Sequence, residues 1–460
     1  MKRKMSKSKE LVLDMTEGKP LSLILKFAVP MLIGNLFQQV YNLVDSVVVG
    51  RLVGADALAA VGASSSITFL FFALCNGFGG GGGIITSQYF GSKEDAMVKK
   101  SITNTAYIMF VFPLLVGIVA FLLSEPILLL LNTPENIMHD SLIYVRTMCI
   151  GIVFVSLYNF ISSMIRALGD SKTPLYFLIG AGILNAILDY VFVKFCNMGV
   201  FGVGLATLIA QFLSGIGCLI FAVSKNPYFK LKKEDFKFER ELIKRVIKLG
   251  VPLSLQFSLI AISCMALQRV VNSFGAVAVA AFTATSRIEQ IIHQPYQTLG
   301  TALSTYTGQN YGARKKERII EGYKKSMLIM VIFSIVMLPL MQLFGEPINR
   351  LFVEDTEVIA MGAKALRITS IFYVFLGVIY VVRGVLNGLG DAFFALLNGI
   401  VEVIGRFTVP IMLTSIALIG VWGIWWSVGI VWFISGFTAW LRYLYYKKKV
   451  LNFSNGVTNE

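Results

Sequence analysis

The sequence has few charged residues for its length. Of its 460 residues, 15% are Asp, Glu, Lys or Arg and 56% are hydrophobic, whereas a soluble chain carries about 25% charged residues. Apolar runs of about 20 residues recur along the whole chain, and a helix of that length crosses the hydrocarbon core of a bilayer. The composition therefore excludes a soluble globular protein and predicts an all-α integral membrane protein.

Motifs that mark metal centres, redox sites and phosphate-binding loops are also missing. The five cysteines form no CxxC pair and no metal-ligand spacing, so we expect no structural disulfide and no metal centre built from them. The sequence has no HExxH motif, and its glycine run at 77–83 lacks the Lys-Ser/Thr ending of a phosphate loop. We therefore expect no enzyme and no cofactor.

The net charge of +15 does not indicate a nucleic-acid partner, because the basic residues lie between apolar runs and not along one face. Such clusters are typical of cytoplasmic loops in membrane proteins. The N-terminus begins MKRKMSKSKE and continues with polar residues, not with a short apolar core. No cleavable signal peptide is expected.

Apolar runs predict twelve transmembrane helices. They lie near residues 21–48, 57–87, 101–124, 141–165, 175–195, 202–223, 246–272, 278–306, 325–345, 361–387, 393–417 and 421–446. If all twelve cross the membrane, the strongly basic segments all lie on one side. The bias of Lys and Arg assigns this side to the cytoplasm, so we expect both termini there and the protein in the cell membrane.

An internal duplication relates the two halves of the chain. QYFGSK at 88–93 resembles QNYGAR at 309–314, and RALGD at 166–170 resembles NGLGD at 387–391, each pair 221 residues apart. A constant offset through six runs predicts two homologous six-helix bundles of the same topology, related by an axis along the membrane normal. We expect a central cavity between them, an arrangement that suits alternating access.

Domain boundaries follow from the runs and the duplication. We predict a cytoplasmic arm at 1–20, an N-lobe bundle at 21–223, a cytoplasmic linker at 224–245, a C-lobe bundle at 246–446 and a cytoplasmic tail at 447–460. The linker is the basic segment between the sixth and seventh runs. We expect the protein to be a monomer in the lipid bilayer.

The most unusual polar residues lie in the fifth run, LYFLIGAGILNAILDYVFVKF, which contains Asn185 and Asp189. A carboxylate at membrane depth is costly, and intramembrane acids mostly face a bundle interior or a water-filled ion pathway. Their spacing of four residues places both side chains on one helix face. The second half has Arg406 and Pro410 at the equivalent positions, so the shared fold does not require the pair.

Several motifs together point to one family. They are QQVYNLVDSVVVGRLVGADALAAVG after a basic arm, QYFG, RALGD with its second copy, and the GVxG that opens the sixth and twelfth runs. The sequence resembles multidrug and toxic compound extrusion (MATE) transporters over nearly its whole length. This resemblance implies a secondary antiporter that exports organic cations and other amphipathic drugs in exchange for protons or sodium.

Within that family, the sequence is similar to the DinF-type branch, which has a polar cluster in its N-lobe. The resemblance assigns proton or cation coupling, and a sodium site if sodium is the coupling ion, to Asp45, Asn185, Asp189 and Thr207. The NorM-type branch instead relies on carboxylates in the seventh and tenth spans. Those spans contain no acid here, which argues against a NorM-type site.

The resemblance also assigns substrate binding and a helix bend. Substrate binding is assigned to Gln38, Tyr41, Asp45 and Asp189. Pro30, matched by Pro252 in the second half, lies inside the first span and is expected to kink it. The family resemblance implies that bending of this helix accompanies proton uptake.

The predicted N-lobe cluster suits two coupling ions. Its carboxylate, amide and hydroxyl oxygens are ligands for a hard cation such as sodium. Burial and mutual repulsion of Asp45 and Asp189 would also favour reversible protonation. Both mechanisms use the same residues, so the coupling ion stays open. By linkage, the ion favours one N-lobe conformation and a cationic substrate disfavours it.

Structural roles are the alternatives for these residues. Asp189 could be a packing acid paired with a basic residue, Asp45 a solvated residue near a helix end, and Thr207 a donor to its own helix. In the C-lobe, Glu402 and Arg406 are spaced to form an internal pair. We expect Glu289 to be a paired structural charge and His293 to be a satisfied cavity residue.

The sequence leaves other functions as alternatives to efflux. A flippase for lipid-linked precursors or polysaccharides is the alternative within the broader fold superfamily, but flippases usually present an arginine-rich cavity, whereas the predicted N-lobe cluster is acidic. An intramembrane enzyme would need a recognisable pair of catalytic groups or a metal motif. A channel is disfavoured because the duplication resembles that of alternating-access carriers.

Overall fold

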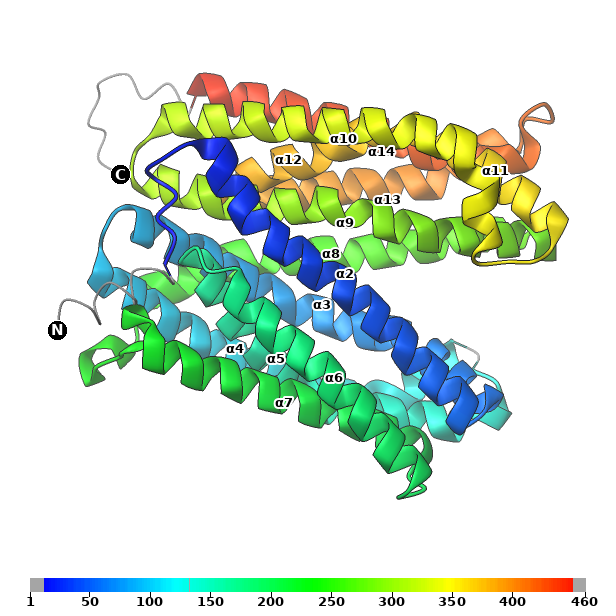
Figure 1. Ribbon diagram of the computed structural model, residues 1–460, viewed down its shortest axis with the longest axis horizontal. Helices are drawn as coiled ribbons and strands as arrows, with labels where there is room; N and C mark the ends of the chain where they lie inside the picture. Colours follow the sequence, from blue (N-terminus) through cyan, green and yellow to red (C-terminus); the bar gives the residue numbers. More distant parts are fainter. Residues whose placement is uncertain (1–11, 132, 450–460) are drawn as a thin grey trace. The chain divides into compact units, whose positions relative to one another are not determined.

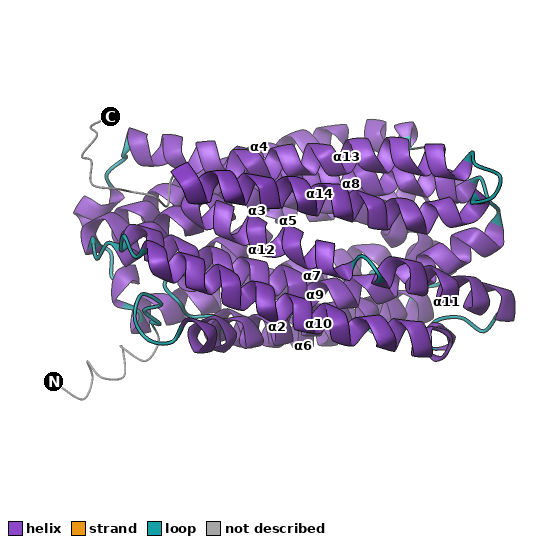
Figure 2. Ribbon diagram, turned by 90° about the horizontal axis from the view of Figure 1, so that it is seen from above, coloured by secondary structure: helices purple, strands orange, loops and turns teal. Residues whose placement is uncertain are grey.

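The computed structural model describes residues 12–131 and 133–449, and within these ranges every regular element is a helix (Figures 1 and 2). The α-helices are α2 (Pro20–Leu52), α3 (Ala55–Gly91), α4 (Asp95–Leu130), α5 (Glu135–Ala167), α6 (Lys172–Lys194), α7 (Gly199–Lys225), α8 (Arg240–Asn272), α9 (Ala276–Gly312), α10 (Lys316–Arg350), α11 (Thr356–Ser370), α12 (Tyr373–Leu389), α13 (Ala392–Thr414) and α14 (Gly423–Lys449). Three short 3-10 helices, η1 (Pro227–Phe229), η2 (Lys233–Phe236) and η3 (Gly420–Trp422), lie between them. Residues 1–11 of the predicted arm and 450–460 of the predicted tail lie outside the described residues.

The predicted spans all coincide with helices, and the all-α membrane fold is confirmed. Ten of the described helices are long and apolar enough to cross a bilayer, and α11 and α12 meet the same test together as one bent span. The eighth predicted span is α9, a 37-residue helix that is not among the ten. Polar residues account for this difference, since its second half contains QPYQTLGTALSTYTGQNYG.

The lipid-facing surface is clearest on α4. Phe110, Leu115 and Leu122 on this helix are exposed, whereas its buried residues include Ser101, Thr105 and several other small or polar ones. Small residues inside and large apolar residues outside are the pattern of a helix that packs in a bilayer. The chain is therefore a multi-pass membrane protein.

The tenth predicted span is not one continuous helix. It is divided at Ile371 and Phe372 into α11 and α12, whose axes differ by 53°. The Nε2 group of Gln342, on α10, donates a hydrogen bond of 2.8 Å to the carbonyl oxygen of Arg367. A side chain that satisfies a freed backbone carbonyl lets a helix break at that point. In the N-lobe, the residue equivalent to Gln342 is Phe121. The N-lobe counterpart of α11 and α12 is α5, which is one continuous helix.

The structure divides into two compact units, Met1–Glu17 with Leu25–Ser258, and Gly18–Ile24 with Leu259–Glu460. In the first unit, α5 packs against α3, α4 and α7, and α6 packs against α7. In the second unit, α12 packs against α9, α10 and α14, and α13 packs against α14. These neighbours are equivalent along the two halves, as expected for a duplicated bundle.

The duplication extends to backbone conformation. Lys93 and Arg314, 221 residues apart, are non-glycine residues with positive φ angles of 61° and 58°. Gly169 and Gly390, in the repeated LGD motif, have φ angles of 89° and 91°. Left-handed conformations are uncommon for non-glycine residues, so their recurrence at one offset shows that both halves use the same turns.

The predicted linker is fastened to α4. Tyr107 donates a 2.6 Å hydrogen bond to the carbonyl of Phe236, and the Asn104 side chain accepts one of 2.9 Å from the backbone of Glu239. Lys100 pairs with the Glu239 carboxylate at 2.8 Å, and this hydrogen bond lowers the pKa of Glu239. The segment between α7 and α8 therefore has a fixed attachment within the first unit.

Candidate functional site

A close approach of α2 and α6 positions the predicted N-lobe site. A Cβ atom added at Gly182 on α6 would lie 2.8 Å from Cε1 of Phe37 and 3.5 Å from Cβ of Tyr41. Only glycine therefore leaves room for these two side chains of α2. This contact brings Tyr41, and Asp45 one turn further along α2, beside the part of α6 that carries Asp189.

The two carboxyl groups lie beside each other. Those of Asp45 and Asp189 are close enough to share a hydrogen bond when one of them carries a proton. The Asp189 side chain is fully buried, with 0% exposure, and Asp45 is half-buried. Helices α2 and α6 thus unite two acids that are 144 positions apart in the sequence.

Neither carboxyl group is neutralised by a neighbour. Among the described residues, Asp45 and Asp189 form no ion pair, and both Asp189 oxygens and Oδ1 of Asp45 are buried without a hydrogen-bond partner. Burying a charge is very costly unless it is paired. The alternative that Asp189 pairs with a basic residue is therefore wrong for the described chain.

Asn185 and Thr207 supply further oxygens. The Asn185 amide donates a 3.3 Å hydrogen bond to Oγ1 of Thr207, and the Thr207 hydroxyl donates a 3.1 Å bond to the carbonyl of Val203. The donors are thus used within the protein, while Oδ1 of Asn185 is buried without a partner among the described residues. Thr207 does bond its own helix, as the alternative held, but it also holds Asn185 in place.

Two residues of this region were not predicted. Tyr144 on α5 is buried and lies within electrostatic range of Asp45, Asp189 and Tyr41. Gln211, one turn after Thr207 on α7, has a buried Oε1 atom without a described partner. Tyr144 lies in a run of ordinary apolar character, so no sequence signal marked it. The four-residue spacing from Thr207, by contrast, is a sequence signal that could have indicated Gln211.

Of the three remaining predicted residues, only Tyr41 lies near the carboxyl pair. Tyr41 is within electrostatic range of both acids, but Gln38 has an exposed side chain. Pro30 lies inside the continuous helix α2, about four turns before Asp45. The structure therefore brings together five of the seven predicted residues, namely Tyr41, Asp45, Asn185, Asp189 and Thr207.

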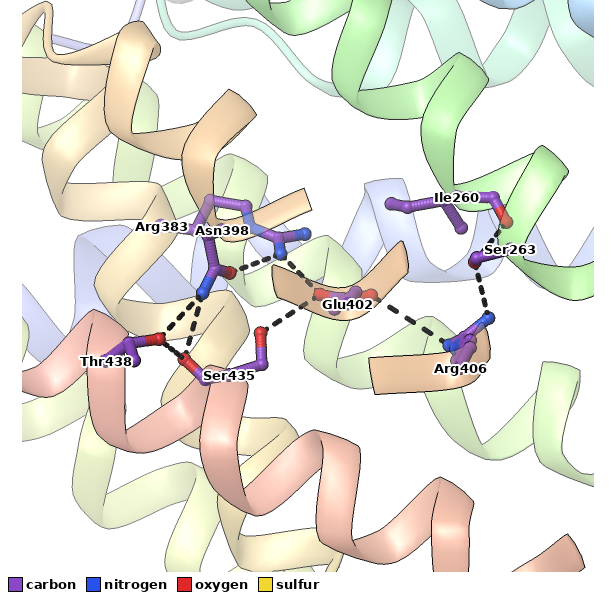
Figure 3. Close-up of polar contacts among 8 residues, drawn as sticks. All are labelled: Ile260, Ser263, Arg383, Asn398, Glu402, Arg406, Ser435 and Thr438. Carbon is purple, nitrogen blue, oxygen red and sulfur yellow. Dashed lines mark hydrogen bonds and ion pairs between the residues drawn. The ribbon is translucent and has the colours of Figure 1, made fainter. Parts of the chain in front are cut away.

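The C-lobe has a polar centre of opposite character (Figure 3). Arg383 Nη2 donates to Glu402 Oε1 at 2.7 Å and to Asn398 Oδ1 at 2.6 Å. Glu402 also accepts a 3.3 Å bond from Ser435, and its other oxygen lies 3.9 Å from Arg406. The predicted Glu402–Arg406 pair is confirmed, but Arg383, which the sequence analysis missed, is the closer partner.

Two other C-lobe expectations are wrong for the described residues. Glu289 forms no ion pair there, and its Oε1 atom is buried without a hydrogen-bond partner. His293 is likewise not satisfied, because no described residue bonds its buried Nε2 atom. Its ring instead contacts Trp432 edge to face, with centroids 5.4 Å apart. The i,i+4 spacing of these two residues places both on one face of α9.

No cluster of three or more His, Cys, Asp or Glu side chains in the described part of the chain could hold a metal ion. The N-lobe oxygens come instead from two acids, an amide and a hydroxyl. Such a mixed set suits a monovalent cation or a proton better than a tightly held transition metal.

Repeated helix packing, apolar spans and a buried acidic pair confined to one half define a duplicated, helical membrane protein. The MatE family model matches the chain at residues 30–191 and again at 252–409, once in each half. The chain belongs to the MatE family, as the resemblance implied.

Two relatives from Bacillus subtilis (strain 168) are similar over most of the chain. The probable multidrug resistance protein YpnP is 32% identical over 444 residues, which cover 95% of this chain and 98% of YpnP. The probable multidrug resistance protein YoeA is 28% identical over 408 residues, covering 86% of this chain and 88% of YoeA.

Solved structures share the fold. An outward-facing multidrug resistance MATE family transporter of the MOP superfamily superposes with a TM-score of 0.90 at 22% identity, covering 96% of this chain and 98% of that one. The twelve-helix, two-lobe fold class predicted from the sequence is thereby confirmed.

Proposed function

We propose that this protein is a secondary active antiporter that exports amphipathic, cationic drugs in exchange for protons or sodium. It works by alternating access in the cell membrane, as a monomer with both termini in the cytoplasm. The names of its relatives, which are multidrug resistance proteins, support the efflux role. No chemical transformation of the substrate is part of the proposal.

The observation that carries this proposal is the buried, unpaired carboxyl pair of Asp45 and Asp189. A binding site for a coupling ion has to gain free energy when that ion binds. Two adjacent carboxyl groups meet this requirement, because one proton or one sodium ion relieves their repulsion. Asn185 and Thr207 would supply neutral oxygens to sodium, or hold the acids in place for a proton.

Coupling follows from competition for the same charge. A cationic substrate near Asp45, Asp189 and Tyr41 replaces the proton or sodium ion as the neutralising group. The ion and the substrate then favour different conformations, and each can shift the equilibrium only by its difference in affinity for the two states. Gln38, on the exposed side of α2, is proposed to contact the substrate on its path to this site.

Pro30 is proposed to act as the bending point of α2. Proline lacks the amide proton that would bond the preceding turn, so a helix bends more readily there. Ion uptake at Asp45, further along the same helix, would change how α2 is held against α6. The bend would then carry the change in occupancy along the helix.

Transport of a lipid-linked precursor or polysaccharide is the alternative function. Such substrates carry phosphate or many hydroxyl groups, which an acidic pair without a basic partner would repel or bind poorly. Asp45 and Asp189 thus favour cationic drugs over anionic lipid precursors.

Reconstituted liposomes test the proposed function. Purified protein is reconstituted and loaded with a fluorescent organic cation, and efflux is measured under a proton gradient alone and a sodium gradient alone. We expect one of the two gradients to drive efflux against the concentration of the dye. Failure of both gradients, together with movement of a fluorescent lipid between leaflets, would support the flippase instead.

A further inference from the structure

The C-lobe contains a cavity of about 360 Å³, at the lower end of the size range of small-molecule sites. Arg406 and Val428 line it, and these residues are the 221-residue counterparts of Asn185 and Thr207. The cavity thus occupies, within its own half, the place that the acidic cluster occupies in the other. Its chemistry differs, because a guanidinium replaces an amide.

Among the described residues, Arg406 donates hydrogen bonds through Nη1 only. Its Nη1 group donates to Oγ of Ser263 at 3.3 Å and to Sγ of Cys264 at 3.0 Å. On the other edge, Nη2 lies 3.9 Å from Glu402, which is too long for a hydrogen bond. The Nε group is buried and has no hydrogen-bond partner among the described residues. On this edge, Nη2 therefore has only the long ion pair with Glu402, and Nε has no partner among the described residues.

Arg442 shows what the same edge does when it is filled. Its Nε donates to Oδ2 of Asp391 at 3.0 Å, and its Nη2 lies 3.0 Å from the same carboxylate. A carboxylate matches this side of a guanidinium in geometry and charge. Arg406, which lines the cavity, has an equivalent edge that holds no hydrogen-bonded carboxylate and only the 3.9 Å ion pair with Glu402.

The charges around the cavity favour an anion over a cation. Its lining includes two guanidinium groups, Arg383 and Arg406, while Glu402 already bonds Arg383 at 2.7 Å. Glu289, the other acid of the lining, can at most bring the sum to zero. A simple cation could pair there only with Glu289, whereas a carboxylate would gain a charge-assisted, two-point contact with Arg406.

We propose that this C-lobe cavity binds an amphiphilic carboxylate, whose two oxygens accept from Nε and Nη2 of Arg406. The apolar part of the ligand lies against Ile260, Leu376, Ile379 and Trp432, which line the same cavity. The site extends the substrate class of the proposed antiporter to carboxylates and zwitterions. The proposal rests on the proposed antiport function in one respect, namely that the bound compound would also be exported.

The test measures equilibrium binding to the full-length, detergent-solubilised protein, without any gradient. The probe is 2-naphthoate, and 2-naphthamide is its uncharged counterpart of the same shape. We expect calorimetric binding of the carboxylate only, and at least about tenfold weaker binding in Arg406→Lys, which keeps the charge but loses the fork. Arg442→Lys is the matched control and should leave binding unchanged.

A second readout does not depend on a variant of Arg406. Cys264 is exposed, lines the cavity and contacts Arg406, while Cys196 is the other exposed cysteine of the described chain. In Cys196→Ser, 2-naphthoate should slow maleimide labelling of Cys264 and 2-naphthamide should not. This labelling measurement tests carboxylate binding in the cavity even if Arg406→Lys does not fold.

Equal binding of the two probes, unchanged binding in a folded Arg406→Lys, or absence of protection at Cys264 would each overturn the proposal. Such a result leaves the proposed antiport at Asp45 and Asp189 untouched. Conversely, if gradient-driven efflux fails, the carboxylate site can still be detected, since the binding assay needs no transport.

Discussion

The Arg383 guanidinium and the Glu402 carboxylate lie 2.7 Å apart inside the C-lobe, on the separate helices α12 and α13. Their counterparts 221 residues earlier are Ser162 and Ala181. The C-lobe thus neutralises its buried acid with its own base, whereas the N-lobe has neither partner at these positions. The two lobes therefore share a duplicated fold but differ in where their buried charged residues lie.

Breaking this C-lobe pair should strongly destabilise the protein. In Glu402→Gln, the buried Arg383 loses the charge of the carboxylate at 2.7 Å, and we expect the free energy of unfolding to fall by about 3 kcal/mol. Glu125→Gln is the control, because the Arg146–Glu125 pair is longer, at 3.4 Å, and 38% and 54% exposed. That change should cost less than about 1 kcal/mol. Unfolding in detergent measures both, and equal losses would contradict this assignment.

The break between α11 and α12 should depend on Gln342. Gln342→Leu removes one of the two side-chain donors to the Arg367 carbonyl, which then keeps only the bond from the Ser370 hydroxyl, at a cost of about 1 kcal/mol. We expect faster amide hydrogen exchange at residues 366–376, measured by mass spectrometry. The exposed Gln297 supplies the control, Gln297→Leu, which should leave exchange there unchanged. Unaltered exchange in Gln342→Leu would show that the break has another cause.

The contact of α9 with α12 should not tolerate a methyl group. A Cβ at Gly384 would lie 2.4 Å from the backbone oxygen of Gly300, so Gly384→Ala forces the helices apart and should cost about 1–3 kcal/mol. At Gly180, a Cβ would meet nothing within 4 Å, and Gly180→Ala should stabilise its helix by about 0.5–1 kcal/mol. Thermal unfolding measures both, and a stabilised Gly384→Ala would refute the close packing.

Pro30→Ala should slow transport without harming stability. The substitution restores a backbone donor inside α2, which strengthens the helix and resists bending. We expect gradient-driven efflux to fall severalfold while the unfolding temperature stays equal or rises. Pro252→Ala, at the matching position of α8, is the control and should have a smaller effect. If efflux in Pro30→Ala equals that of the unaltered protein, the bend of α2 is not part of the cycle.

The sequence predicted the helices and the duplication well, because both leave periodic signals. Apolar runs reflect the thickness of the bilayer, and the offset between RALGD and NGLGD persists in both sequence and φ angles. The break after Ser370 left no such signal. Gln342, which bonds the Arg367 carbonyl beside the break, belongs to another helix, and no proline or glycine marks the segment ITSIFYV.

The candidate site was predictable only in part, for a related reason. Asn185 and Asp189 stand out as polar residues at helical spacing in an apolar run. The i,i+4 rule found Glu402 with Arg406, yet the shorter bond goes to Arg383, 19 residues away on another helix. Partners on separate helices, such as Tyr144 for the acidic pair, are set by packing that no local pattern contains.

The central claim is that Asp45 and Asp189 carry the coupling ion. It is tested most directly by uphill efflux of a fluorescent cation from liposomes, measured under the proton or sodium gradient that drives the unaltered protein. Asp56→Asn, at an exposed acid of the same lobe, is the control and should retain full activity. We expect Asp45→Asn and Asp189→Asn each to abolish uphill efflux. Gradient-driven efflux that is unchanged in both variants would contradict the account.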